Sequence, residues 1–64
     1  MRVNGEKFNF REGMTVSDLI ADMGFSEAMV AVELNLDILP RDSFSGTVLK
    51  ENDCLEVVRF VGGG

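Results

Sequence analysis

Thr15-Val16-Ser17-Asp18-Leu19-Ile20-Ala21-Asp22-Met23-Gly24 is the stretch that decides the fold, because it carries a clear helical pattern. Its apolar residues recur at the spacing of one helix face: Val16, Leu19, Ile20 and Met23. Thr15 followed three residues later by Asp18 indicates an N-cap, and Gly24 suits the position just after a helix. The sequence therefore predicts one helix that packs a single face against a core.

A hairpin is predicted before this helix. Asn4-Gly5 favours a two-residue type I′ turn, which would join a strand over residues 1–3 to a return strand over residues 6–10. An even loop length sets the apolar residues of the first strand on the same face as Phe8 and Phe10.

Further strands are predicted after the helix, over residues 28–34, 38–39 and 54–61. The short middle strand is expected to end at Pro40, which is tolerated only at a sheet edge or a strand end. The polar loop that follows is expected to cover Phe44. These elements predict an α+β domain with one helix layer.

The last predicted strand is apolar on both faces. Leu55 and Val57 lie on one face, and Cys54, Val58 and Phe60 on the other. One interpretation is an exposed interaction patch that also includes Val61. The other is a central strand whose second face is covered locally, or a bulge that turns Val58 inward.

The predicted fold class is α+β with a ubiquitin-like β-grasp: a mixed four- to five-stranded sheet and one main helix packed across one face. The first and last strands are expected to lie side by side and parallel at the centre. A single β-grasp domain is expected over residues 1–61, followed by a flexible glycine tail over residues 62–64.

Composition excludes several classes of function. The 64 residues include no His, Trp or Tyr and only one Cys, so histidine catalysis, His/Cys zinc sites and disulfide frameworks are ruled out. We expect no bound metal or cofactor and no self-contained enzyme. The net charge of −5 argues against nucleic acid and anionic membranes, and it suits either a basic partner or simple solubility. No apolar run approaches a membrane span and no signal peptide is visible, so a cytoplasmic protein is expected.

The final glycines have two interpretations. Gly62 and Gly63 lack Cβ and can thread a narrow crevice, which would carry the terminal carboxylate of Gly64 into a partner's active site. The alternative is a frayed terminus without a function. Because the glycines directly follow a strong strand, the pattern favours a chemical handle.

The chain resembles the ThiS family of ubiquitin-like sulfur carriers of thiamine biosynthesis over essentially its whole length. The resemblance is carried by a set of short segments in order: Val3-Asn4-Gly5-Glu6, Thr15 to Ile20, Val32-Glu33-Leu34-Asn35 running to Leu39-Pro40-Arg41, and Asn52-Asp53 to Phe60-Val61-Gly62-Gly63-Gly64. The family ends in Gly-Gly, and this chain has one further glycine before that pair.

The resemblance implies that the Gly64 carboxylate is the functional group. A ThiF-like adenylyltransferase would use ATP and magnesium to adenylate it, a cysteine desulfurase or related donor would supply sulfur, and a ThiG-like thiazole synthase would take the sulfur from the resulting thiocarboxylate. The carrier itself would bind no cofactor and would be a monomer when free. Val58, Phe60 and Val61 are the candidates for docking, and Arg59 for a contact at the rim that sets orientation.

Other functions remain open. A MoaD-like molybdopterin synthase small subunit, or a carrier for another sulfur acceptor, would share the fold and the thiocarboxylate. A β-grasp interaction module, or a modifier joined to lysines, would use the same surface differently. Cys54 is expected to be a small buried residue and not a redox centre, and Arg41 is expected to be a solvated charge more than a partner contact.

Overall fold

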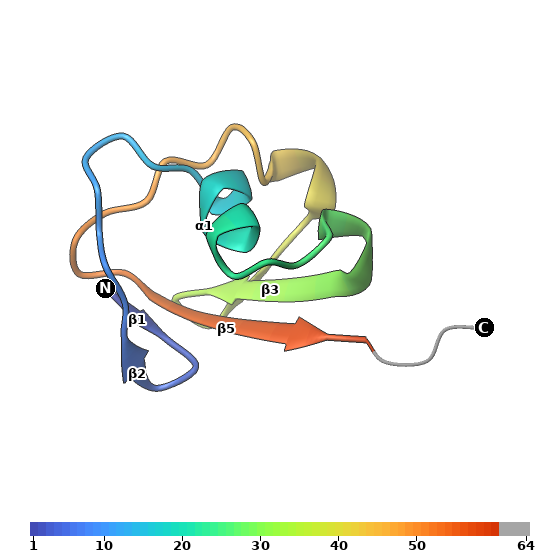
Figure 1. Cartoon of the computed structure of the whole chain (residues 1–64), viewed down its shortest axis with the longest axis horizontal. Helices are drawn as coiled ribbons and strands as arrows, with labels where there is room; N and C mark the ends of the chain where they lie inside the picture. Colours follow the sequence, from blue (N-terminus) through green and yellow to red (C-terminus); the bar gives the residue numbers. More distant parts are fainter. Residues whose placement is uncertain (61–64) are drawn as a thin grey trace.

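The computed structural model describes residues 1–60, and these form a five-stranded sheet with one α-helix across one face (Figure 1). The strands are β1 (Arg2–Val3), β2 (Glu6–Lys7), β3 (Val30–Leu34), β4 (Asp37–Leu39) and β5 (Cys54–Arg59). The helices are α1 (Val16–Asp22) and two short 3-10 turns, η1 (Glu27–Met29) and η2 (Arg41–Ser43). The predicted boundary between a domain over 1–61 and a tail over 62–64 lies outside the described residues.

The sheet is mixed, as predicted, and its strand order is β2-β1-β5-β3-β4. β5 lies at the centre, parallel to β1 and antiparallel to β3. The two outer pairs, β1 with β2 and β3 with β4, are antiparallel hairpins. This is the ubiquitin-like β-grasp arrangement, and it places the end of β5 at one side of the body (Figure 1).

The first hairpin has the predicted two-residue loop. Asn4 and Gly5 adopt φ values of 54° and 81°, and Val3 pairs with Glu6. The return strand is shorter than expected, because the ladder ends at Lys7 and the chain then rises toward α1. Phe8 and Phe10 still pack against the core, although they lie beyond the strand.

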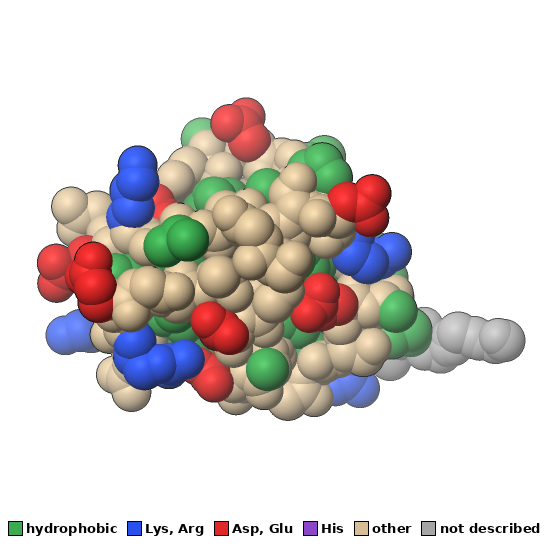
Figure 2. All heavy atoms as spheres, turned by 90° about the horizontal axis from the view of Figure 1, so that it is seen from above, with side chains coloured by type: hydrophobic (Ala, Val, Ile, Leu, Met, Phe, Trp, Pro, Cys, Tyr) green, Lys and Arg blue, Asp and Glu red, His purple; other side chains and the backbone are tan. Residues whose placement is uncertain are grey.

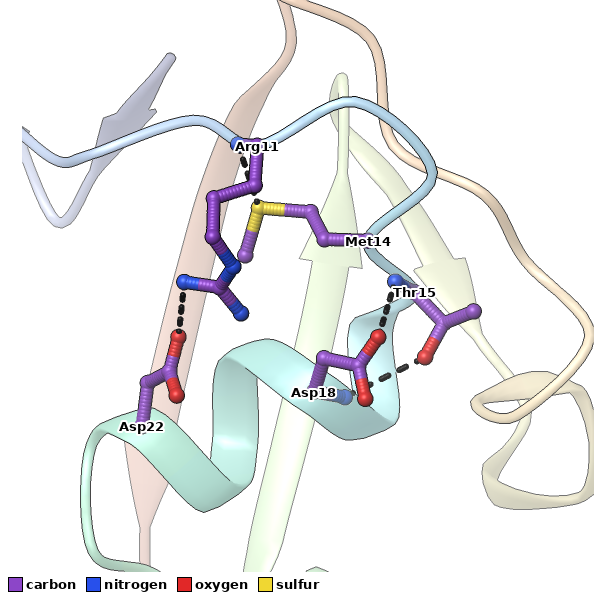
Figure 3. Close-up of polar contacts among 5 residues, drawn as sticks. All are labelled: Arg11, Met14, Thr15, Asp18 and Asp22. Atoms are coloured by element: carbon purple, nitrogen blue, oxygen red, sulfur yellow. Dashed lines mark hydrogen bonds and ion pairs between the residues drawn. The ribbon is translucent and has the colours of Figure 1, made fainter.

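α1 begins and ends where its sequence indicates (Figure 3). The Thr15 hydroxyl accepts from the backbone N–H of Asp18 at 3.2 Å, and the Asp18 carboxylate accepts from the N–H of Thr15 at 2.9 Å. At the other end, Gly24 adopts φ 78°, and the N–H of Phe25 donates to the carbonyl of Ile20 at 3.1 Å. These bonds satisfy groups that a helix end leaves unpaired, so a helix of seven residues is stabilised at both ends.

The strand predicted over 28–34 starts two residues late, at Val30, because η1 occupies the residues before it. The side chain of Arg41 lies across this junction. Its Nε donates to the carbonyl of Glu27 at 2.8 Å and its Nη2 to that of Val30 at 3.3 Å. Arg41 is exposed, as expected of a solvated charge, and its guanidinium in addition ties η2 to the start of β3.

One hydrophobic core lies between α1 and the sheet. It is formed by the buried residues Val3, Met14, Val16, Leu19, Ile20, Val30, Val32, Phe44, Leu49, Leu55 and Val57. Phe44 is buried under its loop, as predicted. Met23, the fourth member of the predicted helical stripe, is only partly buried at the edge of this cluster.

Candidate functional site

β5 carries the candidate site, and its side chains alternate strictly between the two faces of the sheet. Leu55 and Val57 point to the core and are 2% and 6% exposed, whereas Val58 is 56% exposed. The pairing with β3 is continuous from Val30 opposite Arg59 to Leu34 opposite Leu55. No bulge interrupts it, so the interpretation in which Val58 turns inward is wrong.

An apolar patch surrounds the end of β5. Val58 lies opposite the exposed Ala31, and the N–H of Phe60 donates to the carbonyl of Met29 at 2.8 Å. Phe60 is 49% and Met29 39% exposed. We call Met29, Ala31, Val58 and Phe60 the β5-end patch. An exposed group of this kind on a small protein is typical of an interaction surface.

Arg59 does not join this patch. It has the same strand parity as Val57, so it points toward the helix side, where its guanidinium carbon lies 5.4 Å from the centre of the Phe25 ring. The geometry is that of a cation–π contact. The structure therefore brings together two of the predicted docking residues, Val58 and Phe60, and places Arg59 on the other side of the strand.

Val61 and the three glycines that follow lie outside the described residues. The roles predicted for Val61 in docking, for Gly62 and Gly63 in threading, and for Gly64 as the reacting residue stay predictions.

Cys54 is not the buried residue that was expected. It is exposed on the open face of the sheet, in register with Arg2 on β1, because Leu55 takes the core-facing position at the start of β5. Within residues 1–60, no cluster of His, Cys, Asp and Glu side chains is arranged to hold a metal ion.

Two asparagines that sequence reasoning read only as turn residues hold β5 in place. The side-chain amide of Asn4 donates to the carbonyl of Val57 at 3.1 Å and accepts from its N–H at 2.7 Å. On the other side of β5, Asn35 accepts from the N–H of Cys54 at 3.0 Å and donates to the Asp53 carboxylate at 3.0 Å. Each amide satisfies backbone or side-chain groups that the neighbouring strand does not reach. The signal in the sequence was the asparagine itself, since a glycine in the same turn could not make these bonds.

The helix side of the molecule presents a different surface. Seen from that side, acidic and basic side chains are scattered and the hydrophobic areas between them are small (Figure 2). The ion pair between Arg11 and Asp22, at 2.8 Å, lies on this side next to α1 (Figure 3). Both of its side chains are well exposed, so the pair contributes little to stability. No helix among the described residues is long and apolar enough to cross a membrane.

The chain is similar in sequence both to a protein of about its own length and to much longer proteins. It is 44% identical over 62 residues to a thiazole synthase of Paramagnetospirillum magneticum, in an alignment that covers 97% of this chain and 19% of that protein. It is 31% identical over 65 residues to the sulfur carrier protein ThiS of Bacillus subtilis, with 100% of this chain and 98% of that protein covered. The chain thus spans about a fifth of the length of the thiazole synthases that it matches, a second being that of Magnetococcus marinus with 20% covered.

Solved structures agree with the sequence comparison. A crystal structure of a thiamine biosynthesis protein (ThiS) from Geobacter metallireducens superimposes with a TM-score of 0.76 at 35% identity, covering 98% of this chain and 96% of that one. The model of the ThiS family matches residues 1–64. With the same fold, and with the family match running over its whole length, the chain belongs to the ThiS family.

Proposed function

We propose that this protein is a sulfur carrier of thiamine biosynthesis, acting as a co-substrate of other enzymes and not as an enzyme itself. The observation that carries the proposal is the full-length similarity to the sulfur carrier protein ThiS of Bacillus subtilis, together with the family match. The fold supports it, because the central strand β5 ends at Arg59, and the glycines at residues 62–64 follow it closely in the sequence.

The proposed chemistry takes place on the carboxylate of Gly64. A carboxylate is a poor electrophile, so a ThiF-like adenylyltransferase first joins it to the α-phosphate of ATP, with magnesium, and pyrophosphate leaves. A persulfide sulfur supplied through a cysteine desulfurase or related donor then attacks the acyl carbon, and AMP leaves. Reductive cleavage of the resulting acyl disulfide by a thiol releases the thiocarboxylate. ATP and magnesium belong to the partner, and we propose that the reaction takes place in the cytoplasm.

The thiocarboxylate sulfur is a soft nucleophile that a ThiG-like thiazole synthase takes up for the thiazole ring. The partner is supported by the relatives, since proteins named thiazole synthase contain a segment similar to the whole of this chain. In our proposal, Val58 and Phe60 dock on the partner enzymes beside Val61, and Gly62 and Gly63 enter the narrow active sites.

The test is the intact mass of the protein after incubation with ATP, magnesium, a sulfur donor and the adenylyltransferase of the same organism. We expect a population heavier by the difference between sulfur and oxygen, located in the C-terminal peptide. A matched variant with one alanine added after Gly64 should stay unmodified and keep the thermal stability of the original chain. An unmodified mass for the original chain would overturn the carrier function and favour an interaction module.

The same assay addresses the acceptor. Thiazole synthase should consume the thiocarboxylate and return the unmodified mass. A thiocarboxylate that molybdopterin synthase consumes, and thiazole synthase does not, would keep the carrier chemistry and reassign its pathway.

A further inference from the structure

We propose that a hollow on the open face of the sheet is a docking site for a segment of thiazole synthase that carries a basic side chain next to an apolar one. The hollow has a volume of about 230 Å³ and lies where β1, β3 and β5 run side by side. Its walls include Arg2, Glu33, Leu36, Cys54 and Glu56. None of these residues belongs to the β5-end patch, and the proposal rests on the proposed function only in its choice of partner.

Two carboxylates face one another across the middle of this surface. Glu33 on β3 and Glu56 on β5 are direct cross-strand partners, and both are exposed. Like charges placed directly opposite one another destabilise a sheet. Within residues 1–60 neither glutamate has an ion-pair partner, and Arg2, the cation on the wall of the hollow, donates to the carbonyl of Gly5 at 3.3 Å. A lysine or arginine of a partner would relieve this repulsion.

Leu36 forms an apolar wall of the hollow. Its backbone adopts a left-handed conformation that is unfavourable for leucine. It is 89% exposed, and it adopts φ 74° in the second place of the β3–β4 turn, where glycine is usual. Cys54 contributes a small side chain beside it, which leaves room for a partner's aliphatic group. The site therefore combines an apolar surface with an excess of negative charge.

The hollow and the β5-end patch lie on the same face of the sheet. Glu56 precedes Val58 by two residues, so the hollow and the nearest part of the patch are about 7 Å apart along β5. A thiazole synthase that receives the end of β5 thus reaches the hollow without any change of shape in the carrier. The net charge of −5 favours the approach of a basic segment, and Glu33 and Glu56 place part of that charge on this face.

The experiment compares two double variants with the same change of charge. Glu33→Gln with Glu56→Gln removes the facing carboxylates, whereas Glu12→Gln with Asp42→Asn removes two exposed carboxylates that do not line the hollow. Binding to separately produced thiazole synthase of the same organism is measured by calorimetry at low and high salt. We expect the first variant to bind about five- to tenfold more weakly, with a smaller salt dependence, and the second to resemble the original chain.

Thermal unfolding of the free proteins separates docking from damage to the fold. Relief of the repulsion should raise the melting temperature of the Glu33/Glu56 variant by about 1 to 4 °C while binding weakens. Leu36→Gly should also weaken binding without lowering the melting temperature, because glycine accepts the left-handed conformation.

Equal affinities for the two double variants, or no binding of thiazole synthase to the original chain, would overturn the proposal. So would a dimer of the original chain that the Glu33/Glu56 variant loses, since that would assign the hollow to a second copy. Thiocarboxylate formation by the original chain is scored separately, so the carrier function can stand when the docking site fails.

Discussion

Val57 and Val58 are adjacent, identical in type and opposite in surroundings. Val57 faces α1 and is 6% exposed, whereas Val58 faces away from the helix and is 56% exposed. The period of two in a strand sends them to opposite faces of the sheet. The helix-covered face holds the core, and the open face holds the β5-end patch and the hollow. One central strand therefore serves stability with half of its side chains and leaves the other half free for partners.

The largest expected effect on the free energy of unfolding comes from truncating one side chain on each face of the sheet. Leu19→Ala removes a fully buried side chain under the helix and should lower the free energy of unfolding by about 2 to 5 kcal/mol. Ile38→Ala, at a side chain 80% exposed on β4, should change it by less than about 0.5 kcal/mol. Urea unfolding measures both. A similar loss for the two variants would show that the open face is covered in solution and would break the comparison.

A smaller effect is expected for the adjacent valines. Val57→Ala should destabilise the protein by about 1 to 3 kcal/mol, because it leaves a cavity beside the core. Val58→Ala should leave stability within about 0.5 kcal/mol and should instead weaken binding to thiazole synthase. Unfolding and calorimetry on the same samples give both readouts. Loss of stability at Val58 with unchanged binding would contradict its assignment to an interaction surface.

The smallest effect concerns the N-terminus of α1, the helix that covers one face of the sheet. Thr15→Ala removes a side-chain cap bond and should lower the free energy of unfolding by about 0.5 to 2 kcal/mol. Ser26→Ala is the matched control, since Ser26 precedes η1 without a side-chain cap bond, and it should change stability by less than about 0.5 kcal/mol. Equal effects in thermal unfolding would show that the capping box does not stabilise the helix-covered face.

Much of the fold was predictable because its signals are local. Asn4-Gly5 required a turn with two positive φ values, and Thr15 with Gly24 marked both ends of α1. The sequence did not decide whether Val58 is exposed or buried, since a strand that is apolar on both faces does not reveal which face is covered. The structure decided it through the register between β3 and β5.

The parts that sequence reasoning missed depend on contacts between distant residues. Alternation places Cys54 on the same face of β5 as Val58, so its exposure depends, like that of Val58, on which face α1 covers. The facing pair Glu33 and Glu56 exists only once β3 and β5 are aligned. Arg41 likewise finds its carbonyl partners in a segment that precedes it by more than ten residues. Local patterns predict elements, and register decides which side chains meet.

The parallel pairing of β1 with β5 also governs when the protein can fold. Asn4 and Val57, which share two hydrogen bonds, are 53 residues apart in sequence. Such distant contacts close a long loop and slow folding. During synthesis, β1 has no neighbour on this side until β5 has left the ribosome. A chain cut short before β5 lacks the central strand, Val58 and Phe60 of the β5-end patch, and one wall of the hollow, so unfinished chains cannot compete with the complete carrier for its partners.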